Sequence, residues 1–167
     1  MKAPIVKGSP GLDSQPEGCA TSRPEGHATC RHGLAWVGLS LALALHVADE
    51  ALNGFLSFYN PMVRRIREQV PLLPLPTFEF EWWLAGLILA VAALLAVSTL
   101  VFRGRRWTIP ASYVYGGFMC LNALGHFGGS IAFRRPMPGV YSSPVLAAAS
   151  LWLIVCARRR RTGTPLG

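Results

Sequence analysis

The sequence has little charge for its length, and acidic residues are especially scarce. Charged residues make up 14% of the 167 positions, and only 8 of them are Asp or Glu, whereas a soluble domain carries roughly 25% charged residues. The four cysteines are too few and too scattered for a disulfide framework. The chain also contains no internal repeat, P-loop or GxGxxG motif. With 51% hydrophobic residues, this composition argues against a soluble enzyme and against a disulfide scaffold.

The positive charge is distributed in a way that indicates a membrane rather than a nucleic acid. The net charge is +8, but the arginines stand in short clusters between long apolar runs. Membrane helices are flanked in this way, while a DNA-binding face carries its basic residues along one helix or patch. We therefore expect membrane lipids as surroundings and no nucleic-acid partner.

Four apolar runs predict an all-α, multipass membrane bundle with four transmembrane helices. The runs cover about residues 34–58, 80–102, 111–133 and 139–157, close to the roughly 17–25 residues that a spanning helix needs. The first run holds three ionisable groups, each costing about 2.5–3.5 kcal/mol at a helix centre, so these groups must face other helices. It could also be read as the apolar part of a signal peptide, but several acidic residues precede it, which is unlike a short basic leader.

The segments between and outside the runs are expected to be irregular or interfacial. Residues 1–33 are rich in Pro, Gly, Ser and Thr and predict a disordered tail, and residues 158–167 form a basic C-terminal tail. Asn60-Pro61 is expected to end the first span. Residues 62–70 then form either a short interfacial helix or a solvated loop.

The arginines predict the orientation of the bundle. With four spans, both termini share a side with the 103–110 turn, and that side carries eight arginines near the membrane against five on the other. The positive-inside rule then places both termini in the cytoplasm of a protein of the cell membrane.

Two of the runs carry polar residues at helical spacing. His46, Asp49 and Glu50 lie at positions i, i+3 and i+4, which share one face of a helix, and Asn122 and His126 form another i, i+4 pair. The first and third spans run in the same direction. Because these residues lie at similar distances from the starts of their spans, we expect them to meet at one depth inside the bundle.

The two polar sets together resemble the HXXEE-motif family of small integral membrane proteins. His46-x-x-Asp49-Glu50 is followed by Asn122-x-x-x-His126, and the sequence from Arg134 to Gly139 is similar to the family's entry into its last helix. The chain departs from the pattern at Asp49, where the family has Glu, and at 136–137, where an aromatic–polar pair is typical. The resemblance implies the membrane fold and the choice of site residues. It names no substrate, because the family is uncharacterised and only predicted to be enzymatic.

The candidate site consists of His46, Asp49, Glu50, Asn122 and His126. Of these, His46, Glu50 and His126 could bind zinc or another divalent metal that activates water. Without a metal, a carboxylate and a histidine could act as acid and base. Either chemistry suits a hydrolase acting on a lipid-like or small substrate, as a monomer or a homodimer. A proton-linked transporter or channel component, and a non-catalytic scaffold whose polar groups join helices, remain alternatives.

Overall fold

The computed structural model describes residues 24–162, which form five α-helices and contain no strand. In chain order these are α1 (Pro24–Leu52), α2 (Phe55–Gln69), α3 (Phe80–Phe102), α4 (Thr108–Ala132) and α5 (Ser143–Thr162). The all-α fold class is confirmed. The expectations for residues 1–23 and 163–167 lie outside the described residues.

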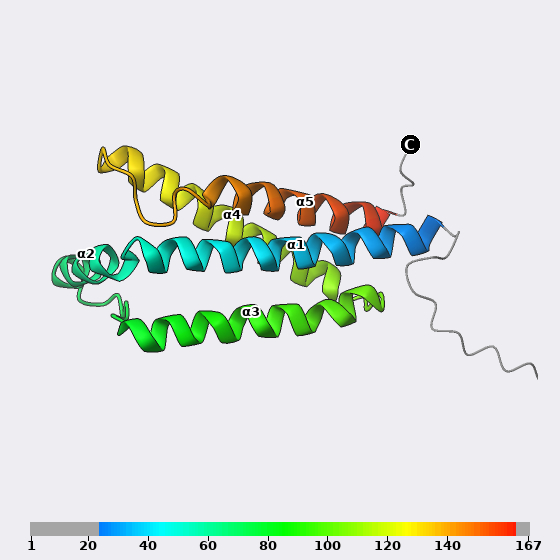
Figure 1. Cartoon of the computed structure of the whole chain (residues 1–167), viewed down its shortest axis with the longest axis horizontal. Coiled ribbons are helices and arrows are strands. Elements are labelled where there is room, and N and C mark those ends of the chain that lie inside the picture. Colours follow the sequence, from blue (N-terminus) through cyan, green and yellow to red (C-terminus); the bar gives the residue numbers. More distant parts are fainter. Residues whose placement is uncertain (1–23, 163–167) are drawn as a thin grey trace, which may run out of the picture.

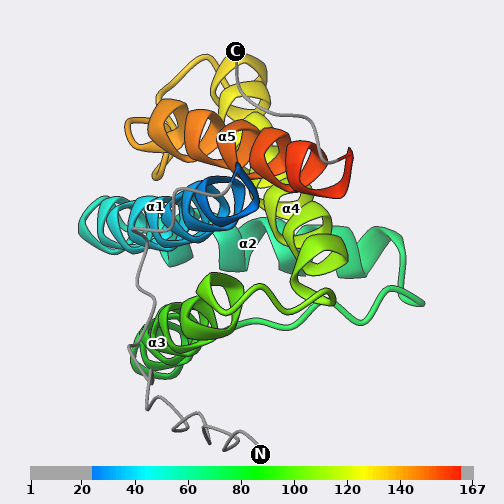
Figure 2. The same cartoon turned by 90° about the vertical axis from the view of Figure 1, so that its right-hand side faces the viewer.

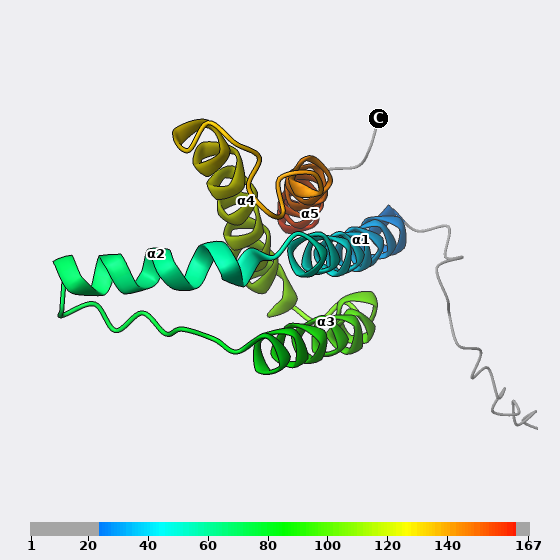
Figure 3. The same ribbon diagram turned by 60° about the vertical axis from the view of Figure 1, so that its left-hand side comes forward.

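Helix α1 is the centre of the bundle, packed between α3 on one side and α5 on the other (Figures 1 and 2). Helix α4 packs mainly against α5. Helix α2 runs across the end of the bundle opposite to the two described chain ends (Figures 1 and 3). The core lies between α1 and its neighbours, where Leu39, Leu146 and Leu153 are fully buried.

Both ends of the described chain are helical where the sequence predicts tails. Residues 24–33 form the first turns of α1, and residues 158–162 form the last turns of α5. Polar contacts between helices explain why these two segments are helical. His32 Nε2 lies 2.7 Å from Ser112 Oγ of α4, and Arg160 Nη1 lies 3.0 Å from His32 Nδ1. These contacts join α1, α4 and α5 at one end of the bundle.

The first apolar run is not one helix up to residue 58. Helix α1 ends at Leu52, and Gly54 takes a left-handed conformation with φ 69° before α2 begins. Glycine adopts this conformation at little cost, so Asn53-Gly54 makes the break. Pro61, expected to end the first span, lies inside α2. The expected short helix at residues 62–70 is therefore the second half of a longer one.

The remaining helices agree with the expected runs to different degrees. Helix α3 has the expected bounds of residues 80–102, and α4 extends the expected 111–133 run at its start. Helix α5 begins at Ser143, four residues later than expected, because residues 136–142 form a turn that packs over the C-terminal half of α4. The close approach of α5 to α4 occurs at Gly116, where a methyl group would lie 2.8 Å from Ile154 Cγ1.

Within residues 24–162, two helices are long and apolar enough to cross a membrane by length and composition. They are α1 over Gly26–Leu52 and α3 over Phe80–Phe102, with mean hydropathies of 1.3 and 2.6. Half of the α1 segment is buried inside the protein, but only 11% of the α3 segment is. A buried core helix or a leader near the N-terminus passes the same test as α1, so α3 is the more informative of the two.

Candidate metal centre

Helices α1 and α4 bring three buried ionisable side chains together. His46 and Glu50 are one turn apart on α1, and His126 lies on α4. Their exposed fractions are 1%, 6% and 5%. Ionisable groups are expensive to bury unless they are paired or hold a metal, so their common burial indicates that they interact.

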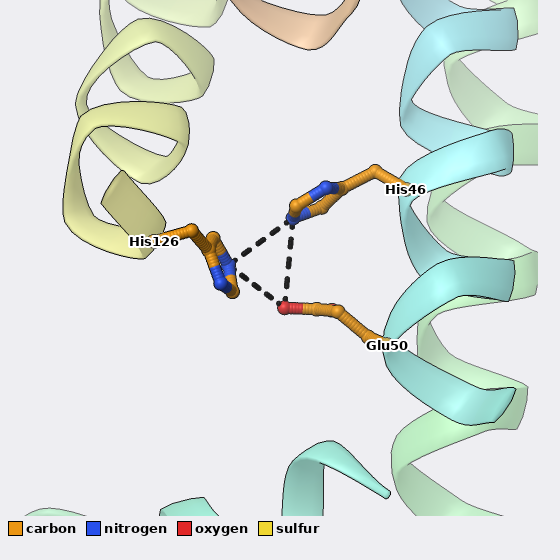
Figure 4. Close-up of side chains that lie close together, drawn as sticks. All are labelled: His46, Glu50 and His126. Carbon is orange, nitrogen blue, oxygen red and sulfur yellow. Dashed lines mark hydrogen bonds and ion pairs between the residues drawn. The ribbon is translucent and has the colours of Figure 1, made fainter. Parts of the chain in front are cut away.

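The three side chains point toward one another with one atom each (Figure 4). His46 Nε2 lies 3.2 Å from His126 Nε2 and 3.5 Å from Glu50 Oε1. The third side of the triangle, from His126 Nε2 to Glu50 Oε1, is 3.1 Å. Among residues 24–162 this is the group of three His, Cys, Asp or Glu side chains placed to share an ion.

The size of this triangle fits a first-row metal. In a tetrahedral site with metal–ligand bonds of about 2.0–2.1 Å, neighbouring ligand atoms lie about 3.3 Å apart. The three measured sides lie within about 0.2 Å of that spacing. A His₂Glu set with one further position for water or substrate is an established zinc arrangement in hydrolases. The residues therefore fit a zinc ion without rearrangement of the helices.

The other ring nitrogen of His46 belongs to a second set of hydrogen bonds. His46 Nδ1 lies 2.8 Å from Ser142 Oγ. The Ser142 hydroxyl donates to Asp49 Oδ2 at 2.7 Å, and the Ser142 backbone N–H donates to the same oxygen at 2.8 Å. Asp49 Oδ1 accepts a hydrogen bond from Asn53 Nδ2 at 2.7 Å. Asp49 thus faces the start of α5 and contacts His46 through a serine.

The surroundings of His126 are less polar. Its Nδ1 is buried and has no hydrogen-bond partner within the described part of the chain. The Phe55 ring of α2 lies 6.0 Å from the His126 ring, between centroids. Ser130 Oγ donates to the His126 carbonyl oxygen and accepts from the Met137 N–H, which joins α4 to the following turn. Apart from its Nε2 contacts with Glu50 and His46, His126 is therefore held by packing and by its backbone.

Gly139 closes the site from the turn between α4 and α5. A methyl group there would lie 2.7 Å from His126 Cε1, 2.9 Å from His46 Cε1 and 3.0 Å from Glu50 Cγ. Its φ of 90° is also one that residues with side chains rarely adopt. Glycine is thus required at this position both by the backbone and by the three side chains beneath it.

The sequence-predicted residues are brought together to different extents. His46, Glu50 and His126 converge, and Asn122 joins them with its Nδ2 3.0 Å from His46 Nε2. Asp49 does not join this group directly, and it contacts His46 through Ser142. Two contributors were missed, Ser142 and Gly139. Their signals were the Pro138-Gly139 pair, typical of a turn, and the serines just before Pro144, typical of a helix start.

A groove lies next to the same turn. It has a volume of about 580 Å³ and is mainly apolar, with two arginines. Its lining residues are Ser130, Ile131, Arg134, Arg135, Pro136, Val140, Tyr141 and Pro144. Val140 directly follows Gly139, so the turn between α4 and α5 contacts both the groove and the triangle of His46, Glu50 and His126.

Comparison with known proteins gives one finding. A family described as "Protein of unknown function with HXXEE motif" matches residues 37–153, which include the three converging side chains and the turn that covers them. No curated protein and no solved structure matches the chain.

Proposed function

The chain belongs to the HXXEE family. From the geometry of its site, we propose that it is a membrane-embedded, zinc-dependent hydrolase. The observation that carries the proposal is the triangle of His46 Nε2, His126 Nε2 and Glu50 Oε1, with sides of 3.1–3.5 Å. Its size matches the ligand spacing of a tetrahedral zinc site.

The charges around the triangle support a divalent ion. Two neutral imidazoles and the Glu50 carboxylate would leave one positive charge of the ion uncompensated. The Asp49 carboxylate lies in the same hydrogen-bond network, through Ser142. A site that is neutral overall suits a bundle interior, where an unpaired charge is costly.

The exposure of α3 supports a membrane location. Its side chains are almost all apolar, yet Leu89 is 72% exposed and Ile88 is 58% exposed. Removing such a side chain from water is worth about 1.5–3 kcal/mol, so a helix with this surface is most stable in lipid. We place α1, α3, α4 and α5 across the membrane, with α2 at the interface and both termini in the cytoplasm.

The residues of the site have distinct roles in the proposed reaction. A divalent ion bound there would lower the pKa of water sufficiently to supply a nucleophile near neutral pH. Glu50 and the two histidines would hold the ion and leave one position for water or substrate. Asn122 Nδ2 reaches the same space from α4 and would orient a substrate oxygen.

The groove beside the site suggests the class of substrate. A mainly apolar lining that includes Arg134 and Arg135 is complementary to an amphiphile that has an anionic head group. Arg135 is positioned over the Phe58 ring, 5.6 Å from its centroid, which restrains its guanidinium. The substrate we propose is therefore an anionic lipid-like ester or phosphoester.

Metal binding can be tested directly on the purified protein in detergent. We expect about one zinc per chain after dialysis, measured by elemental analysis, and loss of that zinc in His46→Ala, His126→Ala and Glu50→Gln. His27→Ala is the matched control, because His27 is exposed and lies at the other end of α1. Zinc retained by both histidine variants would contradict the proposed ligands.

Activity requires a separate experiment. The protein is reconstituted into vesicles of phosphatidylcholine with an anionic phosphatidylglycerol fraction, and lipid products are followed by mass spectrometry. We expect zinc-dependent hydrolysis of the anionic lipid that Glu50→Gln abolishes. Zinc binding without any hydrolysis across anionic esters and phosphoesters would leave a metal site but refute the hydrolase.

A further inference from the structure

The Asp49–Ser142–His46 chain of hydrogen bonds determines where His46 carries its proton. Ser142 has one hydroxyl proton, and the geometry gives it to Asp49 Oδ2 at 2.7 Å, with Gly139 O farther away at 3.2 Å. Directing that proton elsewhere would leave two oxygens in contact without a hydrogen between them. The Ser142 Oγ lone pair is therefore available to accept from His46 Nδ1 at 2.8 Å.

The consequence concerns the opposite nitrogen of the ring. If Nδ1 carries the proton, the neutral imidazole has its lone pair on Nε2. His46 Nε2 is the atom that faces His126 and Glu50. Metal-binding histidines are generally oriented in this way, by a hydrogen bond from the nitrogen that does not bind the metal.

We propose that Asp49 and Ser142 are positioning residues that fix His46 in the Nδ1–H tautomer. Neither residue touches the ion in this assignment. The proposal rests on the proposed metal site for its purpose, but the tautomer itself is a property of the metal-free protein. It gives the motif residue Asp49 a role separate from that of its neighbour Glu50.

The same contacts connect the site to the start of α5. Ser142 directly precedes Ser143, the first residue of the helix, and its backbone N–H also donates to Asp49. Asp49 is held in turn by Asn53. One carboxylate therefore contacts the residue before α5 directly and the His46 ring through Ser142.

The test is nitrogen NMR of protein labelled with ¹⁵N-histidine, in detergent and without metal. In the wild type we expect His46 Nδ1 to have the shift of a protonated ring nitrogen and Nε2 that of an unprotonated one. Ser142→Ala and Asp49→Ala should replace this pattern by exchange between tautomers. They should also weaken zinc binding by about 10- to 100-fold, as is usual when such outer partners are lost.

Ser143→Ala is the matched control. Ser143 is also buried and donates to Gly139 O at 2.7 Å, but within residues 24–162 it makes no hydrogen bond to His46 or Asp49. It should keep both the wild-type tautomer and the wild-type zinc affinity. Equal effects of the Ser142 and Ser143 variants would refute a positioning role and leave only support of the helix start.

The outcomes separate this inference from the proposed function. A wild-type His46 with its proton on Nε2 would overturn the inference, even if the protein binds zinc and even if a variant fails to fold. A wild-type Nδ1–H tautomer that is lost in Ser142→Ala would uphold the inference, even if no zinc binds and the hydrolase proposal fails.

Discussion

Gly139→Ala should damage the site more than any other single methyl group added to the turn between α4 and α5. The new Cβ would lie 2.7 Å from His126 Cε1 and 2.9 Å from His46 Cε1. Both contacts are far inside van der Waals distance. The two imidazoles and the Glu50 side chain must therefore move apart, or the turn must lift away from them.

The energetic cost of Gly139→Ala has two parts. A side chain at a φ of 90° costs about 1–3 kcal/mol of backbone strain, and crowding of a packed interior costs about another 1–3 kcal/mol. The metal-free protein can relieve the crowding by moving the imidazoles, but zinc binding requires them to return. Zinc affinity should then fall by roughly 5- to 150-fold, the range equivalent to about 1–3 kcal/mol.

Two glycine variants separate these parts. Gly54→Ala introduces the backbone strain alone, since φ is 69° there and the nearest atom to a new Cβ is 3.8 Å away. Gly125→Ala introduces neither, because nothing lies within 4 Å of its Cβ position. We expect Gly54→Ala to lower the free energy of unfolding without changing zinc affinity, and Gly125→Ala to change neither by much.

The assay is zinc competition titration combined with unfolding in mixed detergent micelles, followed by circular dichroism. The opposite result is a Gly139→Ala variant that binds zinc as tightly as the wild type and unfolds like Gly54→Ala. The turn would then not lie against the metal ligands.

Three further predictions concern the rest of the bundle. Arg160→Ala should lower the free energy of unfolding by about 1.5–3 kcal/mol, because it removes charged hydrogen bonds to His32 and Thr108. The control Arg161→Ala, at an exposed position, should have little effect. Equal effects of the two variants on unfolding in detergent would contradict the buried network. Gly116→Ala should cost about 1–3 kcal/mol in the same assay, because its Cβ would lie 2.8 Å from a side chain of α5, and an unchanged stability would place α5 elsewhere. Leu89→Arg should reduce membrane insertion of α3 by an amount equivalent to about 2.5–3.5 kcal/mol, and unimpaired insertion in a microsome assay would argue against a lipid-facing side chain.

The sequence predicted the parts of the site that depend on helical spacing. His46 and Glu50 share a face because they are one turn apart, and His126 meets them because α1 and α4 run the same way through the bundle. These inferences need only the regular rise of a helix and the cost of burying charge. They do not depend on the exact ends of any helix.

The errors arose where local turn chemistry competes with hydrophobic length. Asn53-Gly54 breaks the first apolar run, although Pro61 looked like the stronger signal. Pro61 lies inside α2, seven residues after Gly54, and does not end the helix. Gly125 and Gly129 are spaced like the small residues of a helix-packing pair, but Gly125 faces open space and Gly129 faces Met137 of the turn. Contacts between a helix and a loop depend on the path of the loop, and the periodicity of the sequence does not predict that path.

We propose that two imidazoles and one carboxylate from α1 and α4 bind one zinc ion. X-ray absorption spectroscopy at the zinc edge, on protein carrying one zinc per chain, tests it most directly. Zinc bound at this site should have two imidazole nitrogens and oxygen ligands at about 2.0–2.1 Å, and His126→Ala should retain no zinc. Sulfur ligands at about 2.3 Å, or a protein that retains no zinc, would contradict it.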